Sequence, residues 1–131
     1  MLRRNLNLLL ILISVATIFS GLTQIVAPGF VLRLIGAEVN PTANHFFAII
    51  GMFMTLFGGL MLHTVYSATP AGPAVFWSAL QKLGAAVAVG LGIAHGIFSL
   101  MAGAVALFDL FSGILFLYYL RTLKSDDHVG N

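Results

Sequence analysis

The run of apolar residues from 75 to 120 decides what kind of fold this chain can adopt. A membrane-spanning helix needs about 20 mostly apolar residues, so the run is far too long for one crossing. It must therefore hold two helices that fold back on each other. We expect the turn between them around residues 98–103, close to Ser99 and Gly103.

Two more apolar segments precede this run. The first ends before Pro28-Gly29, and the second opens on Asn40-Pro41, where a helix-capping residue is followed by one that is common in the first turn. We therefore predict an all-α fold, an integral membrane four-helix bundle that forms one domain over residues 1–131. The predicted spans cover about residues 6–27, 41–66, 74–97 and 102–120.

Composition indicates that the lipid bilayer is the main surrounding of the chain. Of the 131 residues 60% are apolar and 8% are charged, whereas a soluble domain carries roughly 25% charged residues. The net charge of +2 comes from few groups and provides no basic patch for nucleic acid. The sequence has no cysteine, which excludes disulfides, thiolate metal sites and cysteine nucleophiles.

Basic residues predict the orientation in the membrane, because Lys and Arg favour the cytoplasmic side. Those next to the outer ends of the first and last spans are Arg3, Arg4, Arg121 and Lys124. We therefore expect both termini in the cytoplasm, with residues 121–131 as a solvated tail. The segment 29–37 lies on the opposite side and is typical of a short helix at the membrane interface.

The N-terminal segment allows a second interpretation. Arg3 and Arg4 ahead of an apolar run are also typical of a secretory signal peptide. However, the residues around Gly21 lack the A-x-A pattern of a cleavage site, and the apolar run continues to Ala27. We therefore favour an uncleaved first span.

Asp109 lies in the middle of the last predicted span, where a charge costs roughly 2.5–3.5 kcal/mol and normally faces a partner inside the bundle. Lys82 is the only Lys or Arg within a predicted span. At a rise of about 1.5 Å per residue, Lys82 and Asp109 lie about 13 and about 16 Å from the same side of the membrane. We predict an intramembrane ion pair between them, either direct or bridged by Gln81, Ser112 or water. In the alternatives, Lys82 extends to the cytoplasmic surface beside a protonated Asp109, or the pair moves protons or ions.

Small and polar residues recur at helical spacing along the spans and predict the faces that meet inside the bundle. The third span carries a small residue at every fourth position. This predicts close helix packing through Gly84, Ala88, Gly92 and Gly96. The predicted polar interior is formed by Ser14, Thr17, Gln24 and Thr55.

Two histidines are candidates for ligand binding. His45 begins the second span and His95 ends the third, so we expect both near the outer surface. Together they could ligate haem or, with Glu38, a metal ion, although a single interfacial histidine needs no ligand. The sequence has no paired carboxylates, Ser-His-Asp set or phosphate-binding loop, so we do not expect an enzyme.

The chain resembles small four-span bacterial membrane proteins of the DoxX-like kind in two segments. These are APGFVLRLIGAEVNPTANHFFAIIGMFMTLFGGLML and ALFDLFSGILFLYYL. In such proteins a Pro-ended first helix is followed by a short linker and a glycine-bearing second helix. This sequence departs from them at Asn44-His45, where an Arg would be expected. The resemblance implies a compact helical bundle in the bacterial inner membrane and supplies no catalytic residues.

Three kinds of function are open on the sequence. Short predicted loops and glycine stripes favour an accessory or structural subunit, packed as a homo-oligomer or against a larger membrane complex, and we expect this first. The polar interior favours a module that holds a quinone, lipid, pigment or haem between its helices. Asp109 favours a small proton-linked transporter, although four-span drug exporters carry their acidic residue in the first helix.

Overall fold

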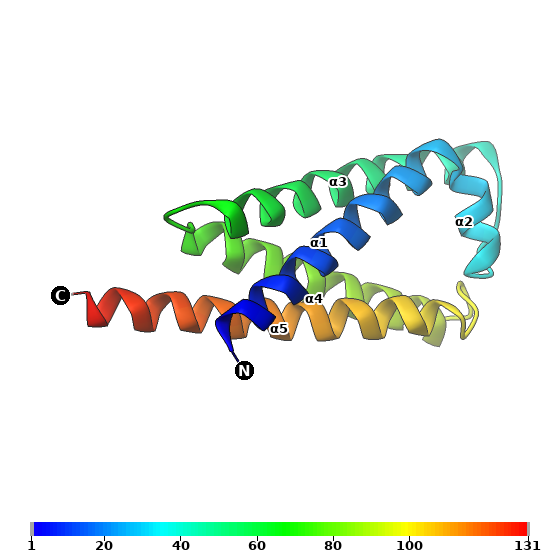
Figure 1. Cartoon of the computed structure of the whole chain (residues 1–131). Coiled ribbons are helices and arrows are strands. Elements are labelled where there is room, and N and C mark those ends of the chain that lie inside the picture. The colour runs from blue at the N-terminus through cyan, green and yellow to red at the C-terminus, as the bar shows by residue number, and fades with distance from the viewer. Residues whose placement is uncertain (1, 131) are drawn as a thin grey trace.

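Figure 1 shows the computed structural model of the chain, which describes residues 2–130. Within this range the chain forms five helices and no strand. They are α1 (Arg3–Val26), α2 (Pro28–Leu34), α3 (Pro41–Tyr66), α4 (Gly72–Ala94) and α5 (Ala102–Val129). Over the described residues, four of them, α1, α3, α4 and α5, are long and apolar enough to cross a membrane. The predicted all-α fold with four candidate spans is therefore confirmed.

The long helices associate as pairs of consecutive spans. α1 packs along α3 and α4 packs along α5, whereas contacts between these pairs are few. In Figure 1 the pairs diverge towards the end of the bundle where α2 lies across the gap between them. We call α1 with α3 the first helix pair and α4 with α5 the second helix pair.

Glycines let α1 and α3 approach each other closely. A Cβ built on Gly21 of α1 would lie 2.5 Å from the carbonyl oxygen of Gly51 on α3. A Cβ on Gly51 would in turn lie 2.6 Å from the carbonyl oxygen of Gly21. Further along α3, Gly58 meets Ile18 and the carbonyl oxygen of Ser14 in the same way. These contacts leave no room for a side chain, so the packing of the first helix pair depends on glycine here.

The stripe of small residues predicted on the third span, now α4, does not pack closely against another helix. Gly84, Ala88 and Gly96 are exposed, and a Cβ on Gly84 or Gly96 would meet nothing within 4 Å in the described chain. Gly92 is buried against the turn that follows its own helix. The physical reason is the orientation of α4. Because Lys82 faces the interior, a residue two positions later points about 200° away from it.

Core side chains concentrate in the half of the bundle that holds the termini. The largest buried ones are Tyr119, Phe116, Leu6, Leu10, Met61 and Val75. They come from α1, α3, α4 and α5, so all of the long helices are packed together in this half. The other half, where the pairs diverge, lacks a comparable cluster among the described residues.

The linker after α2 is fixed to the turn between α4 and α5. The carbonyl oxygen of Ile35 accepts a hydrogen bond from the backbone N–H of Ser99 at 2.8 Å and one from its hydroxyl at 3.1 Å. Gly36 has a φ of +71°, and a Cβ on it would lie 2.7 Å from the Cβ of Ser99. This contact joins the helix pairs at the end where they diverge.

We expect Gly36→Ala to loosen this contact. Alanine is strained at a positive φ, and its Cβ would overlap Ser99, so the free energy of unfolding should fall by about 1–3 kcal/mol. Unfolding in detergent, followed by circular dichroism, measures the change. Gly90→Ala is the control, because a Cβ on Gly90 meets nothing within 4 Å in the part of the chain that the structure describes. An equal stability of both variants would show that the linker does not hold the pairs together.

The last helix is longer than the sequence predicts. α5 continues to Val129, so most of the expected solvated tail, residues 121–131, is helical. The reason is that no proline or glycine lies between the predicted end of the span at Leu120 and Gly130. Arg3 of α1 forms an exposed ion pair with Asp126 of α5, which brings the two ends of the described chain to one end of the bundle. Met1 and Asn131 lie outside the described residues.

Candidate functional site

A buried ion pair lies in the middle of the bundle. Lys82 of α4 and Asp109 of α5 are 2% and 5% exposed, and Lys82 Nζ lies 3.0 Å from Asp109 Oδ1. The contact is direct and is not bridged by Gln81 or Ser112. Because the Lys82 side chain is buried, it does not extend to the membrane surface, which was the alternative that the sequence allowed.

The spacing of the buried residues along α4 and along α5 brings Lys82 and Asp109 face to face. On α4 the buried face comprises Val75, Ser78, Ala79 and Lys82. On α5 the matching stretch comprises Asp109, Ser112, Gly113 and Phe116. Residues three, four and seven positions apart share one face of a helix. The ion pair therefore follows from the packing of these two faces within the second helix pair.

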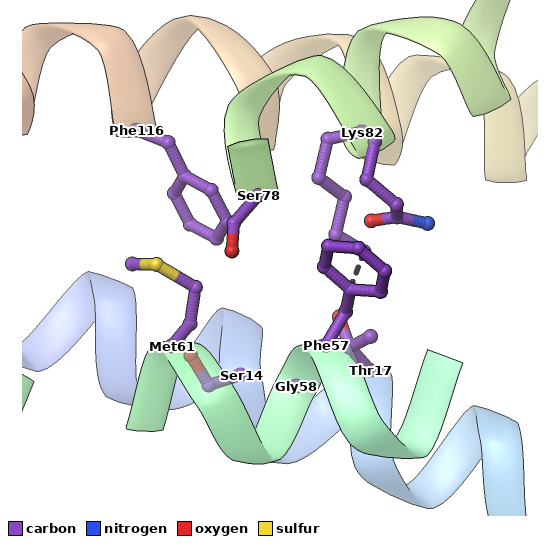
Figure 2. Close-up of a pocket in the computed structure, with 9 residues that line it drawn as sticks. Ser14, Thr17, Phe57, Gly58, Met61, Ser78, Lys82 and Phe116 are labelled. Carbon is purple, nitrogen blue, oxygen red and sulfur yellow. Dashed lines mark hydrogen bonds between the residues drawn. The ribbon is translucent and has the colours of Figure 1, made fainter. Parts of the chain in front are cut away.

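Lys82 also connects the helix pairs to each other. Its Nζ donates a hydrogen bond to Oγ1 of Thr17 on α1 at 2.8 Å, and Figure 2 shows this side chain reaching from α4 to Thr17. The Thr17 hydroxyl donates in turn to the carbonyl oxygen of Ile13 at 2.8 Å. The ring of Phe108 covers the ammonium, with its centroid 5.1 Å from Nζ. An anion, a hydroxyl and an aromatic face together offset the cost of burying this cation.

The predicted polar interior is buried in part. Ser14, Thr17 and Gln24 are buried, and Thr55 is half-buried. The hydroxyls of Ser14 and Thr55 donate to carbonyl oxygens one turn earlier in their own helices. Gln24 Nε2 lies 3.2 Å from the sulfur of Met54, and Gln24 Oε1 has no hydrogen-bond partner within residues 2–130. Of this group, Thr17 contacts the second helix pair through Lys82, whereas the contact of Gln24 with Met54 stays within the first helix pair.

A cavity of about 160 Å³ lies beside the ion pair, in the half where the helix pairs diverge. We call it the central cavity. It is lined by Gln24, Val31, Ile35, Phe47, Ile50, Met54, Gln81, Ala85, Val89, Phe98, Ala102, Val105 and Asp109. Gln81 Oε1 is a second buried acceptor with no partner in the described chain. An apolar cavity of about 150 Å³ in a protein core can hold benzene, so the central cavity has room for a molecule the size of one ring.

A much smaller cavity of about 10 Å³ lies on the other side of Lys82, towards the packed half of the bundle. Figure 2 shows Ser78 and Phe116 facing Met61 and Ser14 across it. Ser78 is 1% exposed, and its Oγ has no partner among the described residues. A space of roughly 10–15 Å³ holds one water molecule, so this cavity fits a single water next to the Ser78 hydroxyl.

The predicted histidine site is not assembled. His45 and His95 are exposed, and the described range contains no group of three His, Cys, Asp or Glu side chains that could hold a metal ion. Glu38 instead accepts a hydrogen bond from the Asn40 side chain at 3.1 Å. These three side chains therefore do not come together as the ligands of one metal ion. His45 lies on α3 of the first helix pair and His95 directly follows α4 of the second, and the pairs diverge at this end (Figure 1).

Several residues of the site were missed by sequence reasoning. The sequence indicates Gln81 as a possible bridge for the ion pair and carries no signal that it lines a cavity. Gly51 and Gly58 form the contact surface of α3, and the sequence signal for it is their separation of seven residues, which places them on one face of a helix. The contact between Ile35 and Ser99 has no local signal, because the two residues are far apart in the sequence.

Comparisons of the chain with protein-family models, with curated proteins and with solved structures found no match. A role for the chain is therefore inferred from its own geometry. The features that carry it are the buried ion pair and the central cavity next to it.

Proposed function

We propose that the chain is a multispan membrane protein that binds a small, mostly apolar molecule in the central cavity. The observation that supports this proposal is Gln24, which lines the cavity, is 8% exposed and has a buried Oε1 atom without a partner among residues 2–130. A buried acceptor without a partner costs roughly 1–3 kcal/mol. A bound molecule that donates a hydrogen bond to it removes this cost, while its apolar part replaces empty space.

The proposal develops one of the functions that the sequence leaves open. An accessory or structural role, in a homo-oligomer or a larger membrane complex, stays a prediction and is compatible with ligand binding. A proton-linked transporter also stays a prediction. We further infer that both termini are cytoplasmic, with α2 at the opposite membrane interface, because Arg3, Arg121 and Lys124 lie at the end that holds the termini. Placement in the bacterial inner membrane rests on the DoxX-like resemblance.

Filling the cavity should abolish binding. Ala85 lines it from α4, and Ala85→Phe places a ring in the space that the ligand would occupy. Native mass spectrometry of the protein in mild detergent is expected to show a small-molecule adduct on the original chain and at least tenfold less on Ala85→Phe. An absorption spectrum of the same sample identifies a pigment, quinone or haem. Ala88→Phe, on the exposed side of α4, is the control and should keep the adduct.

Two results would contradict this proposal. If the original chain carries no adduct and takes up none of an added set of apolar compounds, it is not a binding protein of this kind. If an adduct is present and survives Ala85→Phe unchanged, the molecule lies outside the central cavity.

A further inference from the structure

A second hollow lies next to the central cavity, at the side of the bundle. It measures about 320 Å³ and lies between α1 and α5, which belong to different helix pairs and have few contacts with each other. We call it the lateral groove. It is lined by Ala16, Thr17, Ser20, Met54, Ala104, Val105, Phe108 and Asp109. Met54, Val105 and Asp109 also line the central cavity, so the two spaces share a wall.

The lateral groove faces the lipid. Ala16, Ser20 and Ala104 along its rim are exposed, and they belong to helices that are long and apolar enough to cross a membrane. Because these side chains are small, the gap between α1 and α5 stays open where larger residues would close it. A molecule in the groove would therefore be in contact with lipid chains on one side and with Asp109 and Met54 on the other.

The two spaces differ in chemistry. Gln24 and Gln81 line the central cavity, and the carbonyl oxygen of each is buried without a partner in the described chain, so the cavity favours a group that donates hydrogen bonds. Its volume fits a head the size of one ring. Lys82 and Asp109 neutralise each other, so a charged head would have no counter-ion there. The groove offers mainly apolar walls and favours a hydrocarbon chain.

We propose that the ligand is a neutral amphiphile, with a ring-sized hydrogen-bond-donating head in the central cavity and an apolar chain that leaves through the lateral groove into the bilayer. This inference rests on the proposed function, since it names the class of molecule that the same site takes. It also assigns the route of entry, which runs from the lipid between α1 and α5.

Matched phenols test both parts of the ligand. The probes are 4-octylphenol, 4-octylanisole, whose methyl ether cannot donate a hydrogen bond, and 4-methylphenol, which lacks the chain. Binding is measured by equilibrium dialysis with the full chain in lipid nanodiscs, and empty nanodiscs correct for partitioning into lipid. We expect 4-octylphenol to bind at one site per chain and at least tenfold more tightly than either of the other compounds.

Variants that block the lateral groove test whether the hydrocarbon chain of the ligand lies there. Ala104→Trp and Ala16→Trp place a large ring in the groove from opposite walls, where both alanines are exposed and nothing in the core is disturbed. They should weaken 4-octylphenol at least tenfold and leave 4-methylphenol unchanged. Ala88→Trp, on the exposed side of α4, is the matched control and should bind all three probes as the original chain does. Circular dichroism checks that each variant is folded.

The outcomes separate this inference from the proposed function. If 4-octylphenol binds and both groove variants bind it as tightly as the original protein does, the octyl group of the ligand does not lie in the lateral groove. The inference is then overturned, while the central cavity stays the binding site. If 4-octylanisole binds as tightly as 4-octylphenol, the head of the ligand does not need to donate a hydrogen bond, and this part of the inference is wrong. If no probe binds although the purified chain carries an adduct that Ala85→Phe removes, the ligand class is wrong and the proposed function stands.

Discussion

Lys82→Met is expected to destabilise the protein by about 3–5 kcal/mol, because it leaves a buried carboxylate without its partner. The loss includes the hydrogen bond to Thr17 and the 3.0 Å contact with Asp109. The free energy of unfolding can be measured by titration with SDS in mixed micelles, followed by circular dichroism. Replacing both charges, in Lys82→Met with Asp109→Leu, should restore most of the lost stability, because no unpaired charge then stays in the bundle.

The comparison of these variants isolates the ion pair from other effects. Lys124→Met removes an exposed lysine of α5 and should change the stability by no more than about 0.5 kcal/mol. If the double variant is as unstable as Lys82→Met, or less stable, the two charges do not compensate each other. The stability of the bundle would then depend on the Lys82–Thr17 contact alone.

Gly51→Leu should separate α1 from α3. A Cβ at this position would lie 2.6 Å from the carbonyl oxygen of Gly21 and 2.6 Å from the Cβ of Gln24, and backbone cannot move aside as a side chain can. We expect a loss of about 3 kcal/mol in the same SDS titration, at the upper end of the cost of overpacking.

Gly59→Leu is the matched control on the same helix, because a Cβ on Gly59 meets nothing within 4 Å in the described range. It should be neutral or stabilising by up to about 1 kcal/mol, since leucine favours helix more than glycine does. Equal behaviour of Gly51→Leu and Gly59→Leu would show that α1 and α3 do not rely on a close backbone contact.

The sequence was sufficient for those features that depend on local pattern and depth. Runs of apolar residues indicate the spans, Asn40-Pro41 indicates the start of α3, and Asn40 indeed caps it by accepting a hydrogen bond from the N–H of Ala43 at 2.8 Å. Lys82 and Asp109 could be paired because a buried charge needs a partner at its own depth and few charges were available.

The sequence was insufficient for features that depend on the rotation of a helix about its axis or on a contact between distant segments. The spacing of Gly84 and Ala88 shows that they share a face of α4, but it does not show that this face points away from α5. The sequence predicts His45 and His95 at one depth, yet His45 lies on α3 and His95 follows α4, and the two helix pairs diverge at that end. The central cavity depends on this divergence, and no local pattern in the sequence encodes it.

The arrangement of the ion pair has a consequence for membrane insertion. Lys82 and Asp109 lie 27 residues apart on consecutive spans, so both charges enter the bilayer within one helical hairpin. Each charge can therefore neutralise the other as soon as α4 and α5 are side by side, before the hairpin meets the first helix pair. Thr17 is made earlier in the chain and is already in place on α1 as a further acceptor for the ammonium. The late hairpin thus carries its own counter-ion into the membrane, and its buried ammonium meets the early hairpin at a neutral hydroxyl and not at a second charge.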